Sequence, residues 1–219
     1  MGIYAKKKGR GMTPDEVRAL FTGQDGSYRF ARWGRPIAPV VFGVTDETLA
    51  TLKGACEAVV ALAGHRMAET DPELGANLMV FFFRDWSELP LVPNLDRLVP
   101  DLGPLVERLA AAGATQYRLF RFDASGAIRA AFVFQRMDAG LAELPAEAVA
   151  LNQMVQVILL WSETGFAGQS PLARLPDGTL VLRPEIAGVI RAGYDPAMPL
   201  AADDPAHALR LAARLECGR

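Results

Sequence analysis

The sequence predicts an α+β fold in which a twisted, mostly antiparallel sheet packs against one long buried helix. Two strand patterns over 117–135 are separated by the turn Asp123-Ala124-Ser125-Gly126, which is typical of a β-hairpin. The stretch 146–162 follows Pro145 and is apolar on nearly every side, so we expect a buried helix there. The chain has 219 residues, of which 51% are hydrophobic and 22% charged, and this is the composition of a globular protein.

We expect one α+β domain over residues 27–219, preceded by residues 1–26 with a basic tail and one short helix. The basic residues of the tail are Lys6, Lys7, Lys8 and Arg10. In the short helix, Thr13 is the expected N-cap and Pro14 the first helical residue. The sequence has no internal repeat and no linker that is long or polar enough to divide the rest of the chain.

Further strands are predicted where apolar residues alternate with polar ones or form a continuous run. Alternation over 28–33 predicts a half-buried strand, and a second strand is predicted over 37–44. Pro39 favours an edge position for the second strand, because proline cannot donate a ladder hydrogen bond. The continuous apolar run in 77–83 predicts a central strand buried on both faces, and 180–182 predicts a short strand.

The remaining helices follow from capping residues and apolar spacing. Thr45 is the expected N-cap of a helix that runs to about Ala63, with apolar residues at helical spacing on one face. Four prolines between 90 and 104 predict a loop, and a helix should follow over 104–112. Two short helices are predicted to begin near Pro184 and Asp203.

Charge and composition argue against several classes of function. A net charge of −2 gives no concentrated basic surface, so we expect no nucleic-acid partner. The longest apolar run, 157–161, is too short to cross a membrane, and no targeting segment is visible near the start, which favours the cytoplasm. The two cysteines, Cys56 and Cys217, do not make a disulfide framework.

The familiar catalytic motifs do not occur in the sequence. His65 and His207 each lack a metal-binding partner at ligand spacing, and we interpret both as surface histidines. No G-x-S-x-G motif is present, and the glycines of 23–26 are not followed by the Lys-Ser/Thr of a phosphate-binding loop. We therefore expect no catalytic residue, no metal site and no cofactor.

Three amides interrupt the predicted buried helix and form the candidate cleft. Asn152 and Gln156 are four residues apart and share a helix face, with Gln153 beside them. A buried amide must be hydrogen-bonded, or it costs about 1–3 kcal/mol. The three side chains therefore either tie the helix to the neighbouring hairpin or line a cleft.

Short motifs and the order of elements point to a family. The motifs are Arg32-Trp33 followed closely by Pro36-Ile37, the helix with its three amides, and Tyr194-Asp195-Pro196. With the order strand, helix, central strand, helix, hairpin and buried helix, the chain resembles the zincin-type metallopeptidases. It is also similar to a bacterial family of unknown function that looks like a degenerate relative of these peptidases.

In zincins the helix after the hairpin carries the motif His-Glu-x-x-His. The resemblance implies that Asn152 and Gln156 stand where the two histidines would be, and Gln153 where the catalytic glutamate would be. Amides are poor zinc ligands, and a glutamine cannot act as the general base that activates water. The resemblance therefore implies a peptidase-like fold that has lost catalysis.

Three hypotheses for function follow. The first is a non-catalytic zincin-like domain whose cleft at Asn152, Gln153 and Gln156 binds a peptide segment or a partner protein. The second is a hydrolase that uses dispersed carboxylates, with Glu143, Glu147 and Glu163 as the candidates. The third is a structural subunit of a larger assembly, based on the basic tail and on an apolar surface that 79–83 would leave at a sheet edge.

Overall fold

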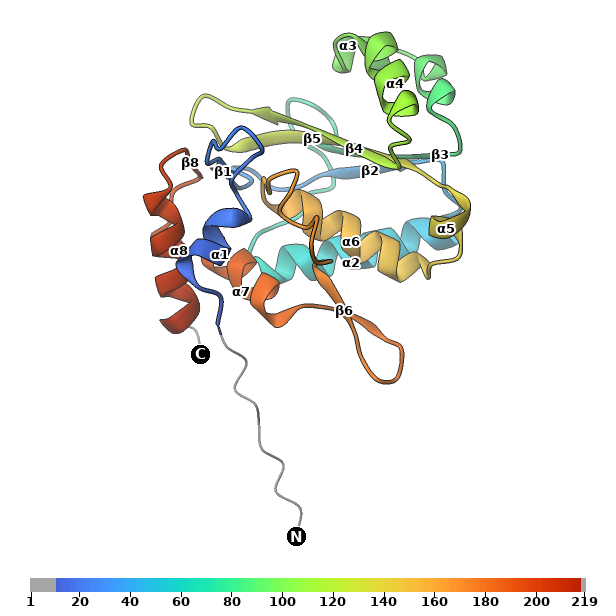
Figure 1. The fold of residues 1–219 in the computed structure, drawn as a ribbon. Helices are drawn as coiled ribbons and strands as arrows, with labels where there is room; N and C mark the ends of the chain where they lie inside the picture. The colour runs from blue at the N-terminus through green and yellow to red at the C-terminus, as the bar shows by residue number, and fades with distance from the viewer. Residues whose placement is uncertain (1–10, 218–219) are drawn as a thin grey trace.

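A computed structural model describes residues 11–217, and a four-stranded mixed sheet lies at its centre (Figure 1). The strand order is β2 (Pro39–Phe42), β3 (Leu78–Phe83), β5 (Ile128–Arg136) and β4 (Gln116–Phe122). Strands β2 and β3 pair in parallel, as do β3 and β5, whereas β4 and β5 form the antiparallel hairpin. The α+β class and the hairpin over 117–135 are confirmed.

The expectation of a mostly antiparallel sheet is wrong for this central sheet. Long connections, 43–77 and 84–127, return the chain so that β2, β3 and β5 all run in one direction. Such crossovers allow parallel pairing, which a tight turn does not. The continuous apolar run of β3 is typical of a strand covered on both faces in a parallel arrangement, and β3 is indeed central.

Helices cover both faces of this sheet (Figure 1). On one face lie α2 (Asp46–Leu62) and α6 (Ala146–Ile158), which pack against each other and against the larger apolar core. On the other face, η1 (Trp86–Leu91), α3 (Leu95–Leu98) and α4 (Leu102–Ala111) enclose a second core with Phe81 and Phe83 of β3 and Phe132 and Phe134 of β5. The predicted loop before α4 is thus a compact helical cap.

Most of the remaining elements extend the larger core at one end of the sheet, whereas the short helix 139–142 lies at the other end (Figure 1). The remaining elements are α1 (Pro14–Ala19), β1 (Phe30–Ala31), α5 (Ala139–Ala142), β6 (Leu172–Arg174), β7 (Leu180–Leu182), α7 (Pro184–Gly193), β8 (Ala201–Ala202) and α8 (Ala206–Cys217). Helix α1 packs against α8, and Val17 and Phe21 are buried in the larger core. The short helix of 1–26 is therefore part of the domain, while the basic tail Lys6, Lys7, Lys8 and Arg10 lies outside the described residues.

Local signals for helix starts agree with the structure. Thr13 caps α1 in a capping box with Glu16, and Thr45 caps α2 through its hydroxyl. Pro39 is the first residue of the edge strand β2, as its chemistry requires. Because β3 is central, residues 79–83 do not leave an apolar surface at a sheet edge.

Helix α6 is shorter than predicted and ends at Ile158 instead of residue 162. The chain then turns extended, because Leu159 forms a bridge with Arg32 and Leu160 donates its N–H to Ala31 O at 2.9 Å. These residues are apolar because they continue through the core as an extended segment. The apolar pattern alone does not distinguish such a segment from more helix.

Three aromatic side chains cap the end of α6. They donate hydrogen bonds to its last carbonyls, which have no partner within the helix. The bonds are Trp33 Nε1 to Val157 O, Trp161 Nε1 to Val155 O and Tyr194 Oη to Ile158 O, each 2.8 Å long. Tyr194 Oη also receives the N–H of Trp33 at 3.3 Å. Trp33 and Tyr194, both from the motifs of the family resemblance, thus meet at the end of the helix that carries the amides.

Candidate binding cleft

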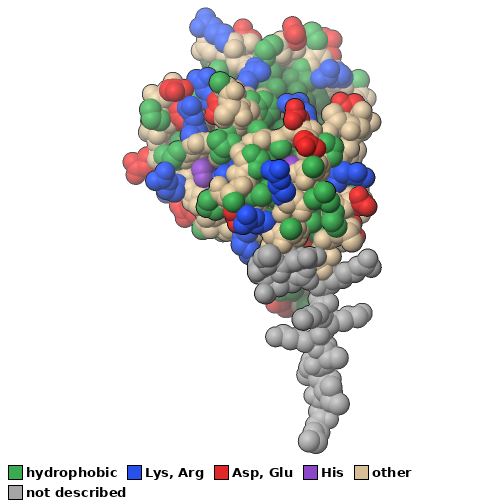
Figure 2. All heavy atoms as spheres, turned by 90° about the vertical axis from the view of Figure 1, so that its left-hand side faces the viewer, with side chains coloured by type: hydrophobic (Ala, Val, Ile, Leu, Met, Phe, Trp, Pro, Cys, Tyr) green, Lys and Arg blue, Asp and Glu red, His purple; other side chains and the backbone are tan. Residues whose placement is uncertain are grey.

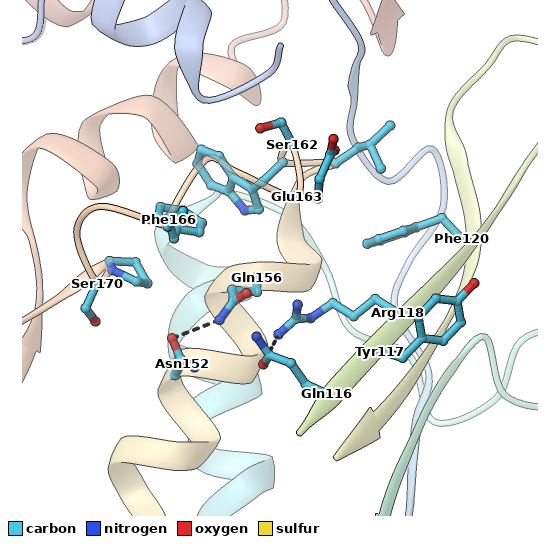
Figure 3. A pocket seen from close by; sticks show the side chains of 14 residues that line it. Gln116, Tyr117, Arg118, Phe120, Asn152, Gln156, Ser162, Glu163, Phe166 and Ser170 are labelled. Carbon is cyan, nitrogen blue, oxygen red and sulfur yellow. Dashed lines mark hydrogen bonds between the residues drawn. The ribbon is translucent and has the colours of Figure 1, made fainter. Parts of the chain in front are cut away.

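A cleft of about 650 Å³ lies between β4 and the second half of α6 (Figure 3). From β4 it is lined by Gln116, Tyr117, Arg118 and Phe120, and from α6 by Asn152 and Gln156. The segment after α6 closes the cleft with aromatic side chains, among them Phe166. The cleft therefore combines amides, one guanidinium, the carboxylate of Glu163 and apolar rings.

The structure divides the three predicted amides between two environments. Asn152 and Gln156 line the cleft, and Gln156 Nε2 donates to Asn152 Oδ1 at 3.0 Å. Both side chains are partly buried. Gln153 is only 1% exposed and points to the hairpin instead, so it does not line the cleft. The prediction of a cleft at all three residues needs this correction, because Gln153 is on a different face of the helix.

Gln153 is the centre of a hydrogen-bond network that joins α6 to the hairpin. Its Nε2 donates to Gln135 Oε1 on β5 and to Gln116 Oε1 on β4, the latter at 3.3 Å. Its Oε1 accepts from Arg118 Nη2 at 3.0 Å. The buried amide is thus satisfied by partners on both strands, which is the structural role considered for it.

Arg118 was not among the sequence candidates, yet it lines the cleft as its one basic side chain, with Glu163 as the acidic one. Its Nη2 donates to Gln116 Oε1 at 2.8 Å as well as to Gln153. No carboxylate of the described residues lies within ion-pair distance of it. Its Nε is shielded from solvent and has no hydrogen-bond partner there. Burial lowers the pKa of Arg118 to about 10, so the guanidinium still carries its charge at neutral pH.

The outer side of β4 has backbone groups that β5 does not use. Arg136 N–H donates to Thr115 O at 2.8 Å, so residues 115 and 136 form a hydrogen-bonded pair. Because such pairs alternate along an antiparallel ladder, the backbone N–H and C=O of Gln116, Arg118 and Phe120 point away from β5. No strand of the described chain pairs with this edge.

The candidate carboxylates do not come together. Glu163 lines the cleft, whereas Glu143 follows α5 and Glu147 lies in the first turn of α6, away from it. The Gln24 N–H donates to Glu163 Oε1 at 2.7 Å and holds the pKa of that carboxyl below its usual range. Within residues 11–217, no group of three or more His, Cys, Asp or Glu side chains is placed to hold a metal ion.

The two histidines also lie outside the cleft, and the prediction that both are surface residues is wrong for His207. His207 is 3% exposed, because it shares the inner face of α8 with Leu211, four residues on. Its Nδ1 is 2.8 Å from Tyr28 Oη, and burial lowers the pKa of His207 to about 4. His65 is half-buried, and its Nε2 lies 2.8 Å from Arg35 O.

Basic and acidic side chains are interspersed on the face that carries α1 and α8 (Figure 2). No helix in the described part of the chain is long and apolar enough to cross a membrane. Comparisons with protein-family models, curated proteins and solved structures find no match to this chain.

Proposed function

We propose that this chain is a non-catalytic, zincin-like domain whose cleft binds an extended peptide segment of a partner protein. The observation that carries the proposal is a cleft of about 650 Å³ beside the unpaired edge of β4. An extended peptide can add to such an edge through main-chain hydrogen bonds, while pockets select alternate side chains. Gln116, Arg118 and Phe120 provide both the outward backbone groups and part of the cleft wall.

The amides support the same function. Asn152 and Gln156 face the cleft, and within residues 11–217 the Asn152 Nδ2 and the Gln156 Oε1 make no hydrogen bond. They can therefore donate to and accept from a peptide backbone. The zincin likeness is supported by the position of these two residues, on a helix that follows the hairpin and lies below it (Figure 1). In place of histidines, they give the cleft a binding surface without a metal.

The two other hypotheses have less support. A hydrolase would need carboxylates that converge on a substrate, but among the three candidates Glu163 alone lines the cleft. The lowered pKa of Glu163 also makes it a weak proton donor or acceptor near neutral pH. The hypothesis of a structural subunit rests partly on an apolar sheet edge at 79–83, and this segment is a central strand.

The proposal is tested with an array of capped hexapeptides that alternate β-branched residues with variable ones. Binding of the full chain is measured by fluorescence anisotropy, and the best peptide is then made in two N-methylated forms. One form is methylated at odd positions and the other at even positions, so both keep the side chains. Strand addition uses every second N–H, so one form should lose binding and the other keep it. Equal binding of both forms, or no binder in the array, would contradict the proposal.

A further inference from the structure

We propose that Arg118 selects ligands of the cleft by binding a carboxylate of the peptide. The inference rests on the proposed function and adds the chemical class that the cleft prefers. It is carried by a guanidinium that is held in place by neutral groups, reaches a cleft and has no counter-ion among residues 11–217.

The contacts of Arg118 orient its charge without neutralising it. Two amide oxygens, from Gln116 and Gln153, both accept from Nη2. Nη1 makes no hydrogen bond to any described residue, and Nε has none either. Removing a charged group from water costs free energy unless the charge is paired. An anion in the cleft would therefore reduce the cost of burying the Arg118 charge.

The surroundings favour a carboxylate as this anion. With Nη2 taken by the two glutamines, Nη1 is the group that can donate to a carboxylate oxygen, and such a charge-assisted bond is stronger than one to a neutral acceptor. Figure 3 shows the Arg118 side chain reaching from β4 towards Gln116 and Gln156. Asn152 Nδ2, which has no partner in the described chain, is a further donor on the same cleft. A ligand carboxylate would thus meet donors from both walls.

A peptide has two sources of such a group, an acidic side chain and the C-terminal carboxylate. The first probe is the best array peptide with Glu or with Gln at one position, both capped at each end. The second probe is a peptide without acidic side chains, made with either a free C-terminus or a C-terminal amide. In one of the two pairs, the carboxylate form should bind at least about 30-fold more tightly than its neutral partner. That pair identifies whether the cleft binds an acidic side chain or the C-terminal carboxylate.

Two variants test whether Arg118 makes this distinction. Arg118→Met should remove the preference, so that the carboxylate form and its neutral partner bind with equal affinity. The matched control is Arg121→Met, which changes the net charge equally but removes an arginine that donates to Leu98 O and does not line the cleft. If Arg121→Met weakens binding as much as Arg118→Met, the preference comes from overall charge and the proposal is wrong.

Gln116→Glu is the second variant, and it keeps Arg118 in place. Gln116 Oε1 already accepts from Arg118 and Gln153, and its amide nitrogen makes no hydrogen bond to the described residues, so no bond is lost. The new carboxylate is an internal counter-ion for Arg118. We expect the melting temperature to hold or rise and the affinity for the carboxylate peptide to fall by about 10-fold or more. In the Arg118→Met background the same change should have no further effect on the affinity.

The results separate this inference from the proposed function. If no array peptide binds, the proposed function fails. If peptides bind but carboxylate and neutral forms have equal affinity for the wild-type chain, the inference about Arg118 fails and peptide binding stands. Unchanged discrimination in Gln116→Glu would overturn the inference in the same way, even if Arg118→Met does not fold.

Discussion

Single residues of α6 show how neighbouring amides take different roles. Gln153 is buried and contacts Gln116, Gln135 and Arg118, whereas Gln156 contacts Asn152 at the cleft surface. When a buried amide is removed, its former partners lose their hydrogen bonds. When a solvated amide is removed, water can replace the lost bonds. The same chemical change should therefore have different effects at positions three residues apart.

We expect Gln153→Ala to lower the free energy of unfolding by about 1–3 kcal/mol, because Gln135 and Arg118 each lose a partner. Gln156→Ala should change it by less than about 0.5 kcal/mol, while weakening capture of the array peptides. Urea unfolding of both variants and of the wild-type chain provides the comparison. Equal destabilisation by the two changes would mean that Gln156 has a structural role and not a binding one.

His207 is a residue-scale source of acid sensitivity. Burial, with a smaller contribution from Arg210, lowers its pKa to about 4 in the folded chain, against the 6.5 of an ordinary histidine. Below pH 6.5 the unfolded chain therefore binds a proton that the folded chain does not. Stability should fall between pH 6.5 and 4, by about 2–3 kcal/mol at the lower end.

His207→Gln checks this assignment, because glutamine can still accept from Tyr28 Oη but does not titrate. Urea unfolding measured from pH 4 to 7 should show a flatter dependence of stability on pH in this variant. Burial lowers the pKa of His65 as well, so His65→Gln is the comparison variant and should keep the part of the slope that comes from His207. A slope that is unchanged in His207→Gln would show that other groups cause the acid sensitivity.

At the scale of elements, the end of α6 is fixed by side chains from distant parts of the chain. Trp33 and Tyr194 bind carbonyls of the last turn, and Trp161 folds back onto the same turn. These bonds satisfy groups that would otherwise be buried without partners. The helix therefore stops at Ile158 although its sequence stays apolar beyond this residue.

Tyr194→Phe removes the hydroxyl that donates to Ile158 O and accepts from Trp33 N–H. We expect a loss of about 1–3 kcal/mol in the free energy of unfolding, measured with chemical denaturant. Tyr117→Phe is the matched control, because within residues 11–217 the Tyr117 hydroxyl makes no hydrogen bond, and it should cost less than about 0.5 kcal/mol. A neutral Tyr194→Phe variant would show that the hydroxyl does not support the end of α6.

Elements with local signals could be predicted from the sequence, and those set by long-range contacts could not. Thr13, Thr45 and the turn at 123–126 mark their helices and hairpin within a few residues. Asp85 and Glu88 form a capping box for η1, a signal that the neighbouring prolines obscured. The direction of β3 relative to β2 and β5 depends on how the connections cross the sheet, which no local pattern contains.

The cleft was only partly predictable for the same reason. Amides in an apolar helix stand out from their surroundings, so Asn152 and Gln156 were found by contrast. Arg118 lies in an alternating strand, where an arginine is ordinarily taken to face solvent. Its position against α6 depends on the register of β4 with β5 and on the placement of the helix, which are tertiary features.

For the molecule as a whole, the central sheet separates two apolar cores. The larger one joins α2 and α6 to the helices near both ends of the chain, and the smaller one lies under η1, α3 and α4. Residues from 17 to 212 contribute to the larger core. Its packing therefore links the two ends of the chain, and α1 lies against α8 at this junction.

Deleting residues 1–26 tests whether this junction is needed for folding. The deletion removes Val17, Leu20 and Phe21 from the larger core, where Phe21 stacks on Trp161 with ring centroids 5.2 Å apart. Loss of one large core side chain costs about 3–5 kcal/mol, and a domain is stable by only about 5–15 kcal/mol in total. The truncated chain should therefore lose its cooperative thermal transition, as followed by circular dichroism. Phe21→Leu in the full chain keeps most of the apolar volume and should melt cooperatively at a lower temperature. A truncated chain with the melting temperature of the full chain would show that α1 is an appendage and that residues 27–219 fold alone.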